Sequence, residues 1–217
     1  MKIGIVAGGP EKSLADLSTY NDIIDIWVGA DKGSAYITKH QLSLDIAIGD
    51  FDSVSNKEIV NIRKQAKRFK QYPVEKDETD LELAVRTALS YKPEMVYFFG
   101  VTGGRLDHEL VNIQLLYQLL KKDVKAVIVD NSNQLSLHMP GEHKVMKDSD
   151  REYISFLPFT HHVEGLTLEG FYYPLSNKTI EWGTTLCVSN QIINDIGTFS
   201  FHDGILILIK SIEPFKK

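Results

Sequence analysis

The sequence predicts a mostly parallel α/β/α sandwich followed by a smaller all-β sandwich. Before about Asn131, short apolar strand-like runs alternate with segments whose apolar residues recur every three or four positions. This alternation is typical of βαβ units with right-handed crossovers. After Asn131, turn residues become frequent and short strands recur without a convincing helix, which is typical of a β-sandwich. We therefore predict two domains, residues 1–133 and 134–217.

The first domain is expected to contain six strands and at least three helices. One helix is expected from about Asn56 to Lys67, and two more begin near Thr79 and Leu106. Thr79 and Glu82 have the spacing of a capping box, which places the start of the second helix at Thr79. The six strands are expected at Ile3–Ala7, Ile26–Gly29, Ile46–Ile48, Arg68–Tyr72, Val96–Phe99 and Ala126–Val129.

The second domain is expected to contain short strands separated by Gly, Pro and Asn turns. These strands are expected at Tyr153–Leu157, Val163–Leu168, Thr185–Ser189 and Ile205–Ile209. A β domain of about 80 residues is small to be stable alone. We therefore expect it to pack on the first domain or on a second chain.

Composition excludes several classes of protein. The chain has 217 residues, of which 43% are hydrophobic, and a formal net charge of −5, which argues against a general nucleic-acid binder. Its single cysteine, Cys187, excludes an intramolecular disulfide and a cysteine-rich zinc site, and its apolar neighbours predict a buried thiol. No secretory signal is visible, and no apolar run approaches the roughly 20 residues that span a bilayer. A cytoplasmic protein that binds neither nucleic acid nor membrane is expected.

Four aspartates gather where predicted strands end. Asp50 and Asp52 follow the third strand, and Asp77 and Asp80 lie where the second helix begins. In an open α/β sheet these strand ends converge on one crevice. Two carboxylates about 4 Å apart repel by roughly 4 kcal/mol at an effective dielectric of about 20. A divalent cation with phosphate oxygens would neutralise the cluster, so the pattern predicts an enzyme that uses Mg²⁺ and a nucleotide.

Each acidic segment also has a simpler explanation. Asp52 or Ser53 would serve as the N-cap of the helix that begins near Asn56. Glu78 and Asp80 would be favoured at a helix start by the macrodipole alone. An Asp-x-Asp pair at a strand end also occurs in haloacid-dehalogenase-type phosphatases, but there it follows the first strand and continues to a Thr. The residues alone leave the metal site and the helix caps both open.

A glycine pair opens the third predicted helix. Gly103 and Gly104 precede Arg105, so exposed backbone N–H groups and a guanidinium would be available to phosphate, although a plain glycine turn has the same sequence. The segment Gly8–Ser13 has the wrong spacing for a P-loop, and Gly-x-Gly-x-x-Gly is absent, so NAD binding has little support.

These segments, in this order, resemble the thiamine pyrophosphokinase family, bacterial type. The pattern is formed by Gly49–Ser53, Lys76–Glu82 and Gly103–His108. Ala30–Gly33 resembles the family's Ala-Asp-Gly-Gly turn, with Lys32 in place of a glycine; the role of Lys32 stays open. The segments Pro140–His143, Gly165–Leu168 and Val188–Asn190 resemble the family's thiamine-binding C-terminal domain.

The resemblance implies that ATP and thiamine react, with Mg²⁺, to give AMP and thiamine diphosphate in a homodimer. It implies that Mg²⁺ lies among Asp50, Asp52, Asp77 and Asp80, which are expected to be catalytic together with Arg105 and Asp107. Contacts with ATP are expected from Asp31, Gly33, Gly49, Thr79, Gly103, Gly104, Arg105 and His108, and contacts with thiamine from Trp182, Ser189 and Asn190. Which aspartate would be the general base stays open.

Two alternatives remain. The first is a related Mg²⁺-dependent pyrophosphokinase or nucleotidyl enzyme that acts on another alcohol. The second is a non-catalytic sensor of a nucleotide or of thiamine, which is disfavoured because none of the acidic positions is neutralised. Formation of AMP only in the presence of thiamine would exclude both.

Overall fold

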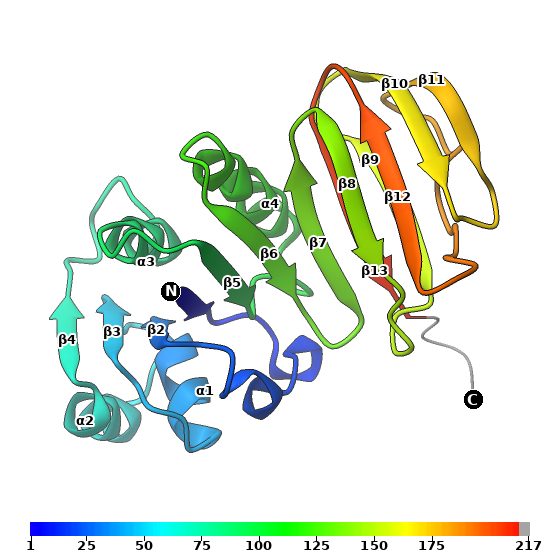
Figure 1. The fold of residues 1–217 in the computed structure, drawn as a ribbon. Coiled ribbons are helices and arrows are strands. Elements are labelled where there is room, and N and C mark those ends of the chain that lie inside the picture. The colour runs from blue at the N-terminus through cyan, green and yellow to red at the C-terminus, as the bar shows by residue number, and fades with distance from the viewer. Residues whose placement is uncertain (213–217) are drawn as a thin grey trace. The chain divides into compact units, whose positions relative to one another are not determined.

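The structure is a computed structural model that describes residues 1–212 (Figure 1). The chain divides into two compact units, Met1–Asn131 and Ser132–Lys217. Each unit has a hydrophobic core of its own. The predicted boundary between residues 133 and 134 is close to this division. The predicted roles of the two domains stay predictions.

The first unit contains a parallel sheet of six strands in the order β4-β3-β2-β1-β5-β6. The strands are β1 (Lys2–Val6), β2 (Ile26–Ala30), β3 (Ile46–Gly49), β4 (Arg68–Gln71), β5 (Met95–Phe99) and β6 (Lys125–Val129). All six predicted strands are confirmed. Strands β1, β2 and β3 are buried along nearly their whole length, because helices cover both faces of the sheet.

Four helices accompany this sheet: α1 (Gly33–Lys39), α2 (Asn56–Gln65), α3 (Asp80–Leu89) and α4 (Leu106–Leu120). Two short 3₁₀ helices, Glu11–Ser13 and Leu17–Tyr20, follow β1. In this unit, α1 and α2 lie on one face of the sheet and α3 and α4 on the other (Figure 1). The predicted start of α3 is confirmed, since Thr79 and Glu82 form both hydrogen bonds of a capping box. Helix α1 was not predicted, because its seven residues are too few for a clear apolar period.

The strand order reverses between β1 and β5. The loops that follow these two strands lie side by side: the Ala7 N–H donates to the Phe99 carbonyl at 2.8 Å, and the Gly9 N–H donates to the Gly100 carbonyl at 2.8 Å. In open α/β sheets, ligands bind at the carboxyl ends of the strands where the order reverses. The topology therefore selects the edge that carries the loops after β1, β2, β3 and β5.

The second unit is an antiparallel β-sandwich, as predicted. One sheet has the order β7-β13-β9 and the other β11-β10-β12-β8. Side chains from both sheets share one core, which includes Phe156, Phe199 and Phe201. The strands are β7 (Asn133–His138), β8 (Gly141–Met146), β9 (Tyr153–Pro158), β10 (His162–Glu169), β11 (Leu175–Glu181), β12 (Ile196–Phe201) and β13 (Leu206–Ser211).

One predicted strand of this unit is wrong. Thr185–Ser189 forms turns and bends, although Cys187 within it is buried, as predicted. Burial raises the pKa of the Cys187 thiol to about 11, so it is protonated at neutral pH. Among residues 1–212, no helix combines the length and the apolar character that crossing a membrane requires.

Candidate active site

Three aspartates meet at the carboxyl edge of the parallel sheet. Asp31 directly follows β2, and Asp50 directly follows the neighbouring strand β3, in which Ile48 is paired with Ala30. Asp52 follows in the same loop. One carboxylate oxygen of each residue lies within 4.8 Å of the other two. We call Asp31, Asp50 and Asp52 the carboxylate trio.

A tight turn brings Asp50 and Asp52 together. The Asp52 N–H donates to Asp50 Oδ1 at 3.1 Å, and Phe51 between them has a left-handed backbone (φ 62°). This conformation costs a bulky residue on the order of 1–3 kcal/mol, which burial of the ring against Phe69, with centroids 4.7 Å apart, offsets. The turn, and not an extended strand end, therefore sets the positions of these two carboxylates.

The helix-cap explanation for this loop is wrong. The N-cap of α2 is Ser55, which forms a capping box with Glu58, so neither Asp52 nor Ser53 caps the helix. Ser53 instead donates its hydroxyl to Asp31 Oδ2. The second oxygen of Asp31, Oδ1, is buried and has no hydrogen-bond partner among residues 1–212. A buried carboxylate oxygen without a partner is costly unless a cation or a donor joins it.

Two glycines allow this close packing. A Cβ at Gly33 would lie 1.8 Å from the Val6 carbonyl oxygen, so only glycine lets the start of α1 rest on the end of β1. Gly49 has φ 153°, and a Cβ there would lie 3.1 Å from the Asp31 backbone. Lys32, by contrast, has ordinary right-handed helical angles (φ −56°, ψ −24°). Its replacement of a family glycine therefore costs no backbone strain.

Lys76 connects the trio to Asp80. Its Nζ lies 2.8 Å from Asp50 Oδ2 and 3.2 Å from Asp80 Oδ1, and the three side chains are only 15%, 10% and 21% exposed, respectively. Burial alone would raise the pKa of Asp50, but the hydrogen bonds from Lys76 and the Asp52 amide hold it below its usual value. Burial raises the pKa of Asp80 in spite of Lys76. The Asp50 charge, aided by burial and by Asp31, raises the pKa of Asp52.

The other predicted metal ligands lie outside the trio. Asp80 is linked to it by Lys76, and burial, aided by the charges of Asp50 and Asp31, raises the pKa of Asp80. Asp77 is exposed and has no hydrogen-bond or ion-pair partner within the described part of the chain. Its neighbour Glu78 pairs with Arg86 at 2.6 Å, and the Thr79 hydroxyl accepts the Glu82 N–H as a helix cap. The metal roles predicted for Asp77 and Asp80 and the ATP contact predicted for Thr79 stay predictions.

Gly103 and Gly104 precede helix α4, as predicted. Arg105 is the N-cap residue of that helix. The Gly103 N–H donates to Glu109 Oε2 at 3.0 Å. Arg105 donates to Asp107 through Nε at 3.2 Å and Nη2 at 2.6 Å, while Asp107 also accepts the His108 N–H. The hydrogen bond from Arg105 lowers the pKa of Asp107. This pair is largely exposed, so it orients the guanidinium without adding much stability.

The predicted thiamine contacts lie in the second unit and differ in availability. Trp182, directly after β11, is 63% exposed, and its ring lies 5.6 Å from that of His161. Ser189 is exposed and has a left-handed backbone (φ 60°), and its N–H donates to Ser155 Oγ. Asn190 is only 2% exposed. Trp182 and Ser189 are thus accessible to a ligand, whereas Asn190 is not.

The Asn190 side chain holds two loop segments together. Its Oδ1 accepts the N–H groups of Tyr173 and Gln191, each at 2.9 Å, and its Nδ2 donates to the Tyr173 carbonyl at 2.8 Å. Its backbone pairs with Ile154. The structure thus gives Asn190 a structural role, and its thiamine contact stays a prediction.

Replacing Asn190 with Ala should lower the free energy of unfolding by about 2 kcal/mol or more, because the buried Asn190 side chain makes three hydrogen bonds to backbone groups, which then lose their partner. Urea unfolding of this variant and of the exposed control Asn194→Ala measures the effect. Equal midpoints for the two variants would contradict the structural role.

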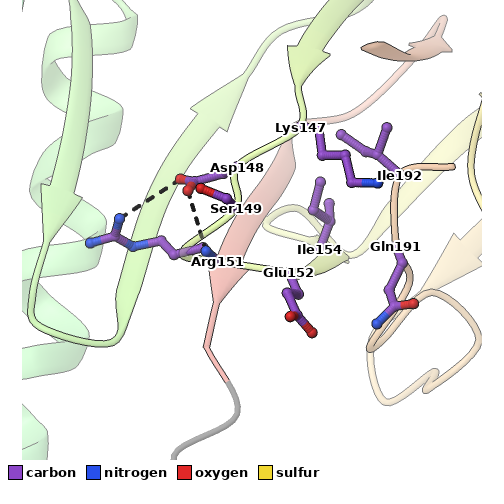
Figure 2. A pocket seen from close by; sticks show the side chains of 8 residues that line it. All are labelled: Lys147, Asp148, Ser149, Arg151, Glu152, Ile154, Gln191 and Ile192. Carbon is purple, nitrogen blue, oxygen red and sulfur yellow. Dashed lines mark hydrogen bonds and ion pairs between the residues drawn. The ribbon is translucent and has the colours of Figure 1, made fainter. Parts of the chain in front are cut away.

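A cavity of about 330 Å³ lies beside this segment (Figure 2). It is lined by residues of the β8–β9 loop, by Ile154 of β9, and by the two residues after Asn190. Arg151 and Asp148 form an ion pair at 3.7 Å on its wall. The lining residues are Lys147, Asp148, Ser149, Arg151, Glu152, Ile154, Gln191 and Ile192. No pattern in the sequence had singled these residues out.

A parallel sheet with carboxylates gathered at its carboxyl edge, followed by a β-sandwich, defines a two-domain α/β enzyme. Residues 17–128 match the description "Thiamin pyrophosphokinase, catalytic domain", and residues 142–206 match "Thiamin pyrophosphokinase, vitamin B1 binding domain". The chain belongs to the thiamin pyrophosphokinase family and is an enzyme of that family.

Relatives along the whole chain agree with this assignment. The thiamine pyrophosphokinase of Bacillus subtilis is 46% identical over 209 residues, which cover 96% of this chain and 98% of that protein. A crystal structure of thiamine pyrophosphokinase from Bacillus subtilis superposes with a TM-score of 0.93 at 44% identity, covering 98% of this chain and all of that one. The Geobacillus thermodenitrificans structure gives 0.89 at 39% identity, covering 99% of both chains.

Proposed function

We propose that this enzyme transfers the pyrophosphoryl group of ATP to the hydroxyl of thiamine, with Mg²⁺, giving thiamine diphosphate and AMP. The observation that carries the proposal is the carboxylate trio at the ligand-binding edge of the sheet. Together with family membership, it supports a site that gathers a cation and phosphate groups.

The residues of the trio fit Mg²⁺. They offer only oxygen ligands, one buried Asp31 oxygen has no hydrogen-bond partner among residues 1–212, and the mutual repulsion of the carboxylates raises the pKa of Asp52. When bound, Mg²⁺ would supply positive charge against the phosphate oxygens. Asp31, Asp50 and Asp52 would hold it, which adds Asp31 to the predicted set. Asp80 would act through Lys76, by fixing the ammonium beside Asp50.

The remaining groups would bind and orient the two substrates. Arg105, held by Asp107, would neutralise phosphate charge, and the loops at the reversal of strand order would contact the nucleotide. The hydroxyl oxygen of thiamine would attack the β-phosphorus of ATP. The bond between the β-phosphorus and the oxygen that bridges it to the α-phosphorus would break, and AMP would leave. The hydroxyl proton would pass to an aspartate near that oxygen. Positioning and charge neutralisation supply most of the catalysis in such transfers.

The test is product analysis with ATP, Mg²⁺ and a panel of alcohols that includes thiamine. We expect AMP only when thiamine is present. AMP formed with another alcohol and not with thiamine would indicate a related pyrophosphokinase, and binding without turnover would indicate a sensor. We also propose that the protein is a homodimer, by resemblance to the family, and its molar mass in solution tests this.

Arg105→Ala should lower kcat/KM by about 10- to 100-fold, because a phosphate-neutralising contact is lost. Arg105→Lys should recover only part of the lost kcat/KM, because the lysine ammonium lacks the planar fork of the guanidinium. Steady-state kinetics with varied ATP measures both. The control is Arg68→Ala, at the start of β4 and so at the opposite edge of the sheet. If Arg105→Ala behaves like this control, Arg105 is only a solvated residue at the start of the helix.

Trp182→Ala should raise the KM for thiamine by about 10-fold or more and leave the KM for ATP unchanged, because thiamine is a cation with flat rings that suits an exposed indole. Stability should change little, since the ring is mostly exposed. Tyr172→Ala removes an equally exposed aromatic side chain and serves as the control. An unchanged thiamine KM in the folded Trp182→Ala variant would place the thiamine pocket elsewhere.

A further inference from the structure

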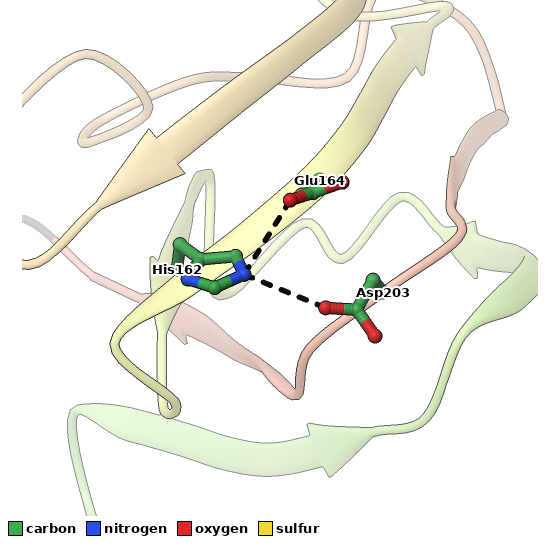
Figure 3. Close-up of side chains that lie close together, drawn as sticks. All are labelled: His162, Glu164 and Asp203. Carbon is green, nitrogen blue, oxygen red and sulfur yellow. Dashed lines mark ion pairs between the residues drawn. The ribbon is translucent and has the colours of Figure 1, made fainter.

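We propose that His162, Glu164 and Asp203 form a second metal site, on the β-sandwich, for a borderline divalent ion such as Zn²⁺. His162 and Glu164 lie at the start of β10, and Asp203 lies in the loop between β12 and β13. The side chains converge on one point (Figure 3). One ligand atom of each lies within 4.8 Å of the other two. This site is separate from the carboxylate trio, which belongs to the first unit.

The spacing suits metal ligands better than hydrogen bonds. His162 Nε2 lies 3.5 Å from Glu164 Oε1 and 3.5 Å from Asp203 Oδ2. Hydrogen bonds to a charged carboxylate are usually about 2.7–2.9 Å long. Two ligand atoms at about 2.1 Å from a shared ion, at the tetrahedral angle, are about 3.4 Å apart. The ring nitrogen is thus already placed, relative to each carboxylate oxygen, as a ligand that shares an ion with it would be, and the two carboxylate oxygens lie within 4.8 Å of each other.

The local charge also favours a cation. Glu164 and Asp203 face the same ring nitrogen, and neither forms an ion pair with a lysine or arginine among residues 1–212. Two carboxylates that face the same atom repel each other, and a divalent ion bound between them relieves this repulsion.

The backbone holds the three residues in place without a ligand. The Glu164 N–H donates to the Asp203 carbonyl at 3.0 Å, and the His202 N–H donates to the Glu164 carbonyl at 3.0 Å. The His162 carbonyl accepts the Thr160 hydroxyl at 2.7 Å, and that hydroxyl accepts the Ile205 N–H at 2.9 Å. The turn before β10 and the β12–β13 loop are therefore fixed to each other, so binding a metal requires little ordering.

The ligand set selects the class of ion. Imidazole nitrogen with two carboxylates suits Zn²⁺, Co²⁺ or Ni²⁺, whereas Mg²⁺ prefers oxygen ligands alone. All three side chains are partly exposed, so water can complete the coordination. A bound ion would link the β10 end to the β12–β13 loop and stabilise the β-sandwich.

The test is isothermal titration of the full chain with Zn²⁺ and with Co²⁺, in excess Mg²⁺ to occupy the carboxylate trio. We expect one ion per chain, a Co²⁺ absorption spectrum that shows nitrogen ligation, and a rise in Tm on binding. His162→Asn, Glu164→Gln and Asp203→Asn should each weaken binding at least about 10-fold.

The matched control is His161→Asn, which changes the neighbouring exposed histidine and should bind like the unchanged protein. Asp50→Asn should also leave Zn²⁺ binding intact, which separates this site from the trio. If His162→Asn binds Zn²⁺ as tightly as His161→Asn, the proposal is overturned, and His162 is only a partner for two carboxylates. Absence of Zn²⁺ and Co²⁺ binding to the unchanged protein would overturn it as well.

Discussion

Replacing Asp52 with Asn should lower kcat/KM by about 100-fold or more, without loss of stability in the absence of ligands. Asp52 supplies one of three carboxylates that would face the cation and the phosphate groups, and one strong electrostatic contribution is worth about this factor. The charges of Asp50 and Asp31 raise the pKa of Asp52, which means that the folded state disfavours its negative charge. Removing that charge should therefore leave the fold equally stable or more stable at neutral pH.

Steady-state kinetics with varied Mg²⁺ and thermal unfolding without ligands give the two quantities. Asp22→Asn is the matched control, because Asp22 is exposed and precedes β2, at the opposite edge of the sheet. Near-normal turnover of Asp52→Asn at low Mg²⁺ would show that the trio does not hold the cation. A large loss of stability would show that the carboxylate serves the fold instead.

Replacing Lys76 with Met should lower both activity and stability. Asp50 and Asp80 are mostly buried, and each would lose its only ion-pair partner among the described residues. We expect a loss of at least about 1–3 kcal/mol in the free energy of unfolding, which is the usual cost of leaving a buried polar group unsatisfied and is larger for a charged group. We also expect a loss of turnover of about 10-fold or more, because Asp50 would no longer be held in place.

Urea unfolding and kinetics of Lys76→Met, with Lys76→Arg as the charge-conserving control, measure these effects. The double variant Lys76→Met/Asp80→Asn should recover part of the stability, because the neutral amide that replaces the Asp80 carboxylate would not need a counter-charge. Lys76 holds the pKa of Asp50 below its usual range, so the stability from this pair is lost only as pH falls through that lowered pKa. The part of the stability difference between Lys76→Met and the unchanged protein that comes from Asp50 should therefore persist until strong acid, whereas the part that comes from Asp80 should be lost at higher pH, because burial raises the pKa of Asp80. Additive losses in the double variant would contradict the coupling.

The first unit could be predicted because each signal was local. Its strands are continuous apolar runs, and helix α3 has both an apolar period and a capping box. Helix α1 escaped prediction, because its position depends on the close approach of Gly33 to Val6 across the sheet. Such a contact between the start of a helix and the end of a strand leaves no periodic pattern in the sequence.

The site could be predicted only in part. The topology brings Asp31 to Asp50, since β2 and β3 are neighbours, but the sequence pointed to Asp77 and Asp80 as the other metal residues. Those two share an acidic motif with Lys76, and only the side-chain geometry shows that the lysine lies between Asp80 and the trio. In the second unit, strands β7, β8, β11 and β12 were not predicted, and most side chains of β8 and β11 are exposed, so these two lack an apolar pattern. Thr185–Ser189 was wrongly predicted as a strand because its apolar residues belong to a turn.

The central proposal is intact transfer of a pyrophosphoryl group, and the fate of isotopic label from ATP tests it most directly. Two reactions with thiamine and Mg²⁺ are compared, one with ATP labelled at the β-phosphorus and one with ATP labelled at the γ-phosphorus. We predict that both labels appear in thiamine diphosphate in equal yield, with unlabelled AMP as the second product. Transfer of the γ label alone, with the β label retained in ADP, would contradict the proposal.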